Sequence, residues 1–159
     1  MTTTILKATT NDIDKLAPLF DAYRVWYRKP ADMDGAKRFL QERLEKDEST
    51  IFIAVNDNKA CLGFVQLYPS FSSTRLSKMW ILNDLFVKQE ERGKGHSKAL
   101  ISRAKKLCKE TQAVGLLLET ETNNHIGNRL YPSVGFELEK NNFYFWTNQP
   151  NSTLSLIHI

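Results

Sequence analysis

The chain has 159 residues, which is enough for one domain with a full hydrophobic core. Its residues are 42% hydrophobic and 25% charged, so we expect a globular protein without long disordered stretches. It has only two cysteines, opens without a secretory leader pattern and contains no apolar run near the ~18 residues of a membrane span. These features argue against a disulfide scaffold and a membrane protein and predict a soluble, cytoplasmic one, and the net charge of +4 suits an anionic ligand such as a nucleotide.

The first third of the chain predicts one strand and two helices. Residues 3–8 have the composition of a strand. Asn11 or Asp12 can cap the helix that follows, because short polar side chains accept the free N–H groups of a first turn. Pro30 ends this helix, and apolar residues return at helical spacing over residues 34–46, where a second helix is expected.

The middle of the chain predicts a hairpin and a long third strand. Residues 50–55 are apolar and β-branched, the turn residues Asn-Asp-Asn occupy 56–58, and 60–68 form the returning strand. The serine-rich residues 69–75 are expected to form a loop, and residues 79–87 the next strand of the same sheet.

The last third of the chain predicts helices that alternate with strands. The helices are expected over residues 97–111 and 124–133. The strands are expected over residues 115–120 and 137–146.

The order of these elements predicts the fold class. Mixed order of this kind indicates an α+β fold, an α/β sandwich in which helices flank a central mixed β-sheet. One domain is expected to span residues 1–147, followed by a tail of undetermined role over residues 148–159.

The most informative segment is the passage from strand to helix over residues 85–100. Gly93 and Gly95 let the backbone turn tightly and approach a ligand closely. The unpaired N–H groups of the following helix lie at the positive end of its dipole, which suits a pyrophosphate group. The residues expected to form this anion site are Arg92, Gly93, Lys94, Gly95, His96 and Ser97.

Two nucleotide-binding patterns fail at this loop. A Walker A loop requires Ser or Thr directly after Gly-Lys, but Gly95 follows Lys94, and Lys88 stands where the first glycine of that pattern belongs. A dinucleotide fingerprint requires a third small residue at the position of Lys98. Both patterns are therefore excluded by their spacing.

A third pattern fits the loop. The sequence resembles the GNAT superfamily of N-acetyltransferases, whose motif Arg/Gln-x-x-Gly-x-Gly/Ala lies between a strand and a helix. Arg92, Gly95 and Ser97 match this motif, with serine in place of the usual glycine or alanine. Ser97 is small and can also cap the helix.

A second family signature strengthens the resemblance. Residues 124–136 are similar to Asn-x-x-Ala…Leu-Tyr…Gly-Phe, with Gly127 in place of the usual alanine. The resemblance covers roughly residues 8–146. The strand over residues 82–87 is similar to that of the branch that includes yeast histone and polyamine acetyltransferases.

The resemblance implies a place for acetyl-coenzyme A. In this family the cofactor lies in a V between two splayed strands, which here would be the strand that ends at Val87 and the strand that begins at Gly115. Backbone groups of Leu85, Phe86 and Val87 would pair with the pantetheine arm, and one N–H there would polarise the thioester carbonyl. None of the three histidines lies at metal-ligand spacing, so no metal is expected.

Catalytic roles follow from the resemblance and from residue chemistry. Tyr131 matches the family tyrosine that protonates the departing thiolate, with packing of its helix as the alternative role. Asp84 is the candidate base, because a carboxylate inside an apolar strand has its pKa raised by burial. Glu119 and a chain of water molecules are the alternatives to Asp84. Asn124 either caps its helix or binds the pantetheine amide.

Together these features predict an N-acetyltransferase that transfers acetyl from acetyl-CoA to a primary amine by direct attack in a ternary complex. The alternative is a non-catalytic acyl-CoA-binding regulatory module on the same fold. No membrane partner is expected, a nucleic-acid partner is suggested only by the basic net charge, and a homodimer is the commonest assembly.

The acceptor, a small molecule or a protein lysine, is expected over the first two helices and the loop at residues 69–75. Candidate acceptor-site residues are Asp21, Tyr23, Trp26, Tyr27, Asp32 and Asp34.

Overall fold

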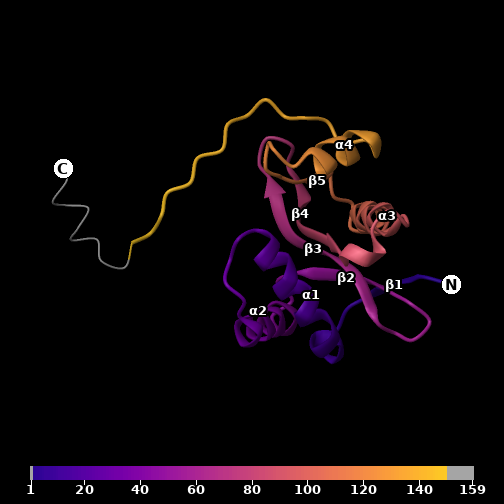
Figure 1. Ribbon diagram of the computed structural model, residues 1–159. Coiled ribbons are helices and arrows are strands. Elements are labelled where there is room, and N and C mark those ends of the chain that lie inside the picture. The colour runs from indigo at the N-terminus through magenta and orange to yellow at the C-terminus, as the bar shows by residue number, and fades with distance from the viewer. Residues whose placement is uncertain (1, 150–159) are drawn as a thin grey trace. The chain divides into compact units, whose positions relative to one another are not determined.

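The structure is a computed structural model in which residues 2–149 are described (Figure 1). The described residues divide into two compact units, one up to Glu121 and one from Thr122 onward. The predicted tail over residues 148–159 lies almost wholly outside the described residues, and the single domain over residues 1–147 stays a prediction. Within residues 2–149, no helix is both long enough and apolar enough to cross a membrane.

The first unit is built on one five-stranded sheet with strand order β1-β2-β3-β4-β5. The pairs β1–β2, β2–β3 and β3–β4 are antiparallel, whereas β5 runs parallel to β4, so the sheet is mixed. The strands are β1 Thr4–Lys7, β2 Thr50–Val55, β3 Cys61–Ser72, β4 Ser77–Val87 and β5 Leu116–Leu117.

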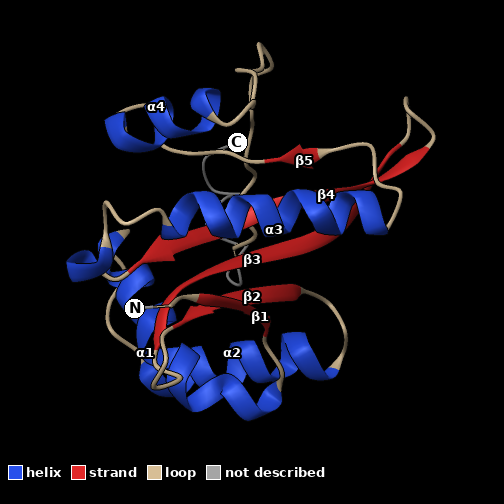
Figure 2. Cartoon of the chain, turned by 90° about the vertical axis from the view of Figure 1, so that its right-hand side faces the viewer, coloured by secondary structure: helices blue, strands red, loops and turns tan. Residues whose placement is uncertain are grey.

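Helices cover both faces of this sheet (Figures 1 and 2). The helices of this unit are α1 Ile13–Trp26, α2 Met33–Glu45 and α3 His96–Glu110. Side chains alternate along a strand, so Ile51 and Ile53 of β2 enter the core shared with α1 and α2. Phe52 between them faces α3, where the Arg103 guanidinium lies 4.2 Å from its ring centre. This arrangement confirms the predicted α+β sandwich.

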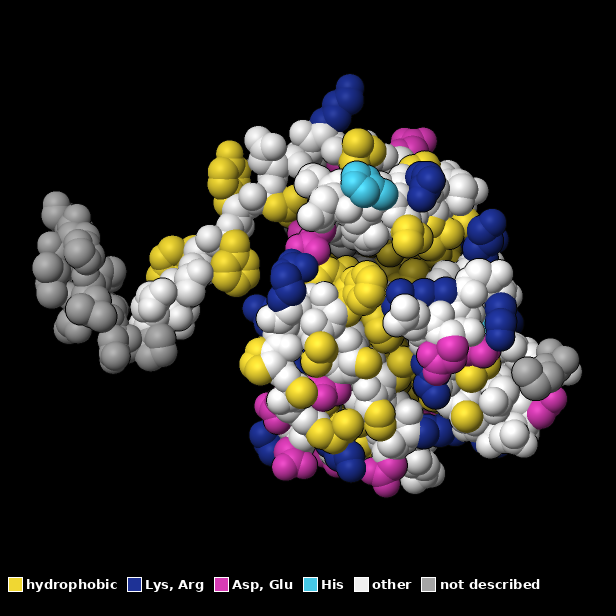
Figure 3. All heavy atoms as spheres, in the orientation of Figure 1, with side chains coloured by type: hydrophobic (Ala, Val, Ile, Leu, Met, Phe, Trp, Pro, Cys, Tyr) yellow, Lys and Arg dark blue, Asp and Glu magenta, His cyan; other side chains and the backbone are white. Residues whose placement is uncertain are grey.

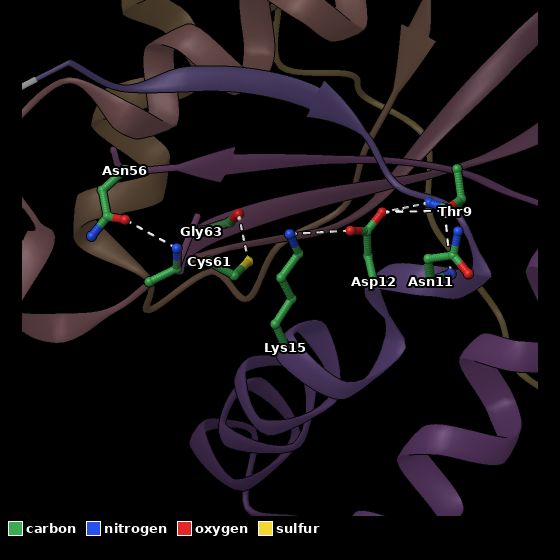
Figure 4. A network of polar contacts seen from close by, with 8 residues as sticks. Thr9, Asn11, Asp12, Lys15, Asn56, Cys61 and Gly63 are labelled. Atoms are coloured by element: carbon green, nitrogen blue, oxygen red, sulfur yellow. Dashed lines mark hydrogen bonds and ion pairs between the residues drawn. The ribbon is translucent and has the colours of Figure 1, made fainter. Parts of the chain in front are cut away.

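The start of α1 is capped differently from the prediction. A short 3-10 helix, η1 Thr10–Asp12, precedes α1 and is capped by Thr9, whereas Asp12 holds the N-cap position of α1 without making a side-chain cap hydrogen bond. The Thr9 hydroxyl accepts the Asn11 N–H at 3.2 Å, and the Thr9 N–H donates to the Asp12 carboxylate at 2.8 Å (Figure 4). Asp12 also pairs with Lys15 at 3.1 Å. The polar run offers several caps, and the reciprocal capping box selects Thr9 because it satisfies two backbone donors at once.

The predicted loop over residues 69–75 is largely strand. β3 continues to Ser72 and β4 begins at Ser77, with the pairs Phe71–Lys78 and Ser72–Ser77 at the end of the ladder. This end of the hairpin is exposed to solvent, as the 78% exposure of Phe71 shows. Serine and lysine can therefore occupy these strand positions without being buried. Cross-strand hydrogen bonds thus extend the hairpin beyond the apolar pattern on which the prediction was based.

Two predicted strands near the end of the chain differ from the structure. The strand expected over residues 115–120 is reduced to the two residues of β5. Residues 137–146 form no strand in the described structure, and Leu138, Tyr144 and Phe145 are at least 90% exposed. The consecutive aromatic residues 143–146 would place rings on both faces of a strand, and a strand also requires a neighbour for its hydrogen bonds.

Candidate active site

The parallel pair β4 and β5 separates after a short contact. The two strands pair only through Trp80–Leu116 and Ile81–Leu117 in the described residues. From Leu82 to Val87, β4 is paired with β3 on its other side but not with β5. The backbone edge of Leu85 and Phe86 is therefore not covered by a strand and can receive an extended ligand that carries amide groups, whereas the Val87 carbonyl accepts the Arg92 Nε donor.

A β-bulge interrupts β4 beside this edge. Gln66 of β3 pairs with Asp84, but the next residue of β3, Leu67, pairs with Leu82, which leaves Asn83 as an extra residue on β4. A bulge bends its strand and redirects neighbouring side chains. Here it accompanies an exposed Asn83 next to Asp84, which is only 5% exposed.

Asp84 lies within a small polar network on the sheet face covered by α1. Its Oδ2 accepts the Gln66 Nε2 donor at 2.6 Å, and its Oδ1 accepts the Asn83 Nδ2 donor at 3.1 Å. The Tyr23 hydroxyl also bonds to this carboxylate, and it lies 3.4 Å from the Asn83 carbonyl oxygen. Burial raises the pKa of Asp84, and these hydrogen bonds oppose that rise without cancelling it.

The glycine loop prepares the start of α3 for an anion. Gly93 and Gly95 have φ of 78° and 87°, in the left-handed region that favours glycine. Gly95 is the N-cap of α3 and makes no side-chain cap, and the first helical bond joins the Ala99 N–H to the Gly95 carbonyl. The N–H groups before Ala99 therefore have no helical partner. Ser97 lies inside the first turn, so its predicted capping role is wrong.

The charged side chains of this loop are braced by neighbours. Glu91 accepts from Lys94 Nζ at 3.0 Å and lies 3.2 Å from Nε2 of His96, which is buried. Lys94 and His96 hold the pKa of the Glu91 carboxyl below its usual range, mainly by these hydrogen bonds. Arg92 donates its Nε to the Val87 carbonyl at 3.0 Å. These contacts fix the loop and leave its backbone N–H groups as the main anion donors.

A groove of about 620 Å³ runs between α1 and the end of β4. Trp26 and Phe86 line it together with Arg92, whose guanidinium carbon lies 4.8 Å from the Trp26 ring centre and 5.2 Å from that of Phe86. One aromatic face that was predicted to receive a cationic acceptor is thus already covered by a guanidinium.

Two of the predicted acceptor-site carboxylates serve the connection between α1 and α2. Asp21 is buried, and its Oδ1 accepts the Asp32 N–H at 3.0 Å and lies 3.4 Å from Arg24 Nη1. Asp32 caps α2 by accepting the Gly35 N–H at 2.9 Å. These roles are structural, whereas Asp34 remains an exposed carboxylate.

The second unit contains α4 His125–Ser133, which carries Tyr131. Asn124 caps α4 by accepting the Gly127 N–H at 3.1 Å, so its predicted capping role is confirmed. A Cβ on Gly127 would lie 2.6 Å from the Asn124 amide nitrogen and 3.3 Å from the Tyr131 ring, which explains glycine in place of alanine. After α4 the Phe136 N–H bonds to the Tyr131 carbonyl at 3.0 Å, and the Phe136 ring packs edge-on 5.7 Å from the Tyr131 ring.

The described residues offer no metal site and no activated cysteine that would suggest a different reaction chemistry. No cluster of His, Cys, Asp and Glu suitable for a metal ion is found within residues 2–149. Burial raises the pKa of Cys61 to about 11 and also raises that of Cys108, so neither thiol is an activated nucleophile. Glu119 is exposed, in contrast to Asp84.

The mixed sheet, the divergence of β4 and β5 and the glycine loop at α3 define an acetyltransferase of the GNAT type. The model of the acetyltransferase (GNAT) family matches residues 16–136, and the chain belongs to this family. The family predicted from the two motifs is therefore confirmed. The narrower resemblance of residues 82–87 to the yeast histone and polyamine branch stays a prediction.

Known proteins agree with this assignment. The chain is 42% identical over 146 residues to an uncharacterized N-acetyltransferase, YhfO, of Bacillus subtilis (strain 168), covering 92% of this chain and 97% of that one. It is 37% identical over 134 residues to a probable acetyltransferase of Haemophilus influenzae (strain ATCC 51907 / DSM 11121 / KW20 / Rd), covering 84% and 90% of the two chains. The crystal structure of a probable acetyltransferase, also 37% identical, superposes with a TM-score of 0.87 over 92% of this chain and 99% of that chain.

The sequence did not single out the partners of Asp84. Gln66 and Tyr23 reach this carboxylate from β3 and α1, far from it along the chain. Gln66, like Asp84, is a polar side chain inside an apolar strand. The same sequence pattern could therefore have identified Gln66 as a candidate site residue. Tyr23 carried no such signal, because its spacing is that of a packing residue.

Proposed function

We propose that this acetyltransferase transfers the acetyl group of acetyl-CoA to a primary amine by direct attack in a ternary complex. The observation that carries the proposal is Asp84, a buried carboxylate with a raised pKa beside the free edge of β4. A protonated amine cannot attack a thioester, so the reaction requires a group that accepts its proton. A carboxylate whose pKa is raised by burial is a stronger base than an exposed one and is suited to that task.

The chain offers acetyl-CoA two matching surfaces. No strand pairs with the edge at Leu85, Phe86 and Val87, where only the Val87 carbonyl is held by Arg92, and this edge suits the amide groups of the pantetheine arm, which can add to it as a strand would. The open first turn of α3 after Gly95 suits the pyrophosphate, because its N–H groups and the helix dipole both favour an anion. Both surfaces are backbone, so the match depends on strand register and glycine geometry more than on side-chain identity.

The chemical steps then follow. The amine gives its proton to Asp84 and its nitrogen attacks the thioester carbonyl, which forms a tetrahedral oxyanion. A backbone N–H of the β4 edge stabilises the oxyanion where its charge develops. The carbonyl re-forms as the carbon–sulfur bond breaks, and Tyr131 protonates the thiolate, the role that its family position implies. No covalent enzyme intermediate is required, in agreement with the buried, weakly acidic thiols of Cys61 and Cys108.

The acceptor class is a finer proposal. The similarity of residues 82–87 to the yeast branch favours polyamines and protein lysines as the first acceptors to try, alongside aminoglycosides and amino acids. On the face shown in Figure 3, basic and acidic side chains are interspersed, and a nucleic-acid partner remains suggested only by the basic net charge. The homodimer and the cytoplasmic location remain predictions from the sequence.

The deciding experiment measures coenzyme A release from acetyl-CoA with a panel of these amines, for the wild type and for Asp84→Asn. Turnover on one acceptor class that falls in the variant, with unchanged acetyl-CoA affinity, supports the proposal. Tight acetyl-CoA binding without turnover on any amine would favour the regulatory binding module instead. Failure to bind acetyl-CoA would refute the proposal.

A further inference from the structure

The residue opposite Asp84 has an unusual hydrogen-bond arrangement. Gln66 of β3 is paired with Asp84 of β4 and is fully buried, with 0% of its surface exposed. Its Nε2 donates to Asp84 Oδ2 at 2.6 Å, whereas its Oε1 has no hydrogen-bond partner among the described residues. Buried polar atoms are nearly always paired, so an unpaired amide oxygen beside a candidate base requires a reason.

The symmetry of the amide supplies a reason. A half turn about the Cγ–Cδ bond of Gln66 exchanges Oε1 and Nε2 with little change in shape. In either orientation one amide atom faces Asp84 and the other is unpaired, so neither orientation is favoured by the rest of the site. The protonation state of Asp84 therefore decides between the two orientations of the Gln66 amide. An ionised Asp84 carboxylate requires the N–H donor of Gln66, and a protonated Asp84 requires its carbonyl acceptor.

We propose that Gln66 is a positioning residue that reverses its hydrogen-bond role when Asp84 takes up the proton of the acceptor amine. The inference rests on the proposed function of Asp84 as the base. During the transfer an N–H bond of the amine breaks, its electron pair stays on nitrogen, and an O–H bond forms at Asp84. The Gln66 amide then turns so that Oε1 accepts this O–H. Asp84 is thus held in one place in both of its protonation states.

The other groups around Asp84 are less buried than Gln66. Asn83 donates to the opposite oxygen, Oδ1, and Tyr23 of α1 contributes a hydroxyl. Tyr68 is the other titratable group that faces Asp84; burial first and the Asp84 charge second raise its pKa, which keeps it neutral. Arg43 of α2 acts on Tyr68, and α3 lies on the opposite face of the sheet. Among the described groups around Asp84, Gln66 alone presents both a donor and an acceptor from a fully buried position.

The inference can be tested without turnover, by NMR of the free full-length protein. The side-chain amide of Gln66 is assigned by the signal lost in Gln66→Met, and the carboxyl carbon of Asp84 by the signal lost in Asp84→Asn. We expect the Gln66 amide signals to shift with pH at the same midpoint as the Asp84 carboxyl carbon, and to stop titrating in Asp84→Asn. An amide that does not change across the Asp84 titration would overturn the proposal.

A pair of variants supplies a kinetic test. Gln66→Met removes the donor and the acceptor together, so both protonation states of Asp84 lose one partner. We expect kcat to fall about tenfold while the acid limb of kcat/KM stays near its wild-type pH. Gln66→Glu provides a second carboxyl that must share one proton with Asp84, so its acid limb is expected to move to higher pH.

The alternatives give different results. If Gln66 is only a fixed donor to the carboxylate, the acid limb of Gln66→Met moves to higher pH. If Gln66 is only structural, Gln66→Met lowers Tm without changing kcat. Either result overturns the proposal. An Asp84→Asn variant with wild-type kcat would refute Asp84 as the base, and this failure is separate because the amide titration is measured in the absence of substrates.

Discussion

Replacing Gly95 with alanine is expected to destabilise the fold through backbone strain. Gly95 has φ of 87° at the N-cap of α3, where an L residue costs about 1–2 kcal/mol. No atom lies within 4 Å of the Cβ that alanine would add, so strain and not a steric clash causes the loss. At about 2–4 °C per kcal/mol for a chain of this size, Tm falls by about 2–8 °C, measured by circular dichroism.

The same change is expected to weaken acetyl-CoA binding. Relief of the strain requires the loop to move, which turns the open N–H groups of α3 away from the pyrophosphate. Loss of one hydrogen bond to a charged group corresponds to a decrease in affinity of about 10–100-fold, which isothermal titration calorimetry resolves.

Gly115→Ala is the matched control for this prediction. Gly115 lies outside the left-handed region and has no atom within 4 Å of an added Cβ, so alanine there is expected to leave Tm and affinity nearly unchanged. Equal losses in the two variants would show that any added methyl group is harmful. A Gly95→Ala protein with wild-type Tm and affinity would refute the assignment of the loop.

Three further predictions concern single side chains. Asp84→Asn is expected to lower kcat by about 10²–10⁴-fold and to raise Tm at neutral pH, because a buried group no longer has to ionise; a lower Tm with unchanged kcat would contradict this. Tyr131→Phe is expected to lower kcat by about 10²-fold, and a smaller effect for acyl donors whose leaving thiol is more acidic would identify it as the acid. Cys61 loses its proton near pH 9.0 in the unfolded chain but near 11 in the folded one, so the folded state binds more protons between these values and the free energy of unfolding falls as pH rises through them. Cys61→Ser is expected to remove about 2 kcal/mol of this fall in urea unfolding at pH 9 and 11, and an unchanged fall would show that other groups cause it.

Local signals were sufficient for most elements and for the phosphate loop. Strand and helix periodicity located β2 at its observed bounds and the helices to within about two residues. The glycines at 93 and 95 predicted the tight turn, because few other residues adopt a positive φ, and the structure places both there. Asp84 was also predicted to be buried from its apolar neighbours alone.

Pairing between distant segments decided the features that the sequence missed. Serines and a lysine give no apolar alternation, yet the β3–β4 ladder carries them as strand to Ser72. Residues 137–146 have the composition of a strand but form no strand in the described structure. A strand requires a neighbouring strand for its hydrogen bonds, and composition does not show whether such a neighbour is present.

The chemistry of the candidate site divides in the same way. The sequence by itself determined the family, the anion-binding loop and the residue types available for proton transfer, because motifs and periodicity are local properties of the chain. Only the tertiary structure brought Gln66 to 2.6 Å from Asp84 and added Tyr23 from α1, because strand register and helix packing join residues far apart in sequence. The pKa of Asp84 depends on those contacts and on burial, which is why the sequence could name the carboxylate but not its environment.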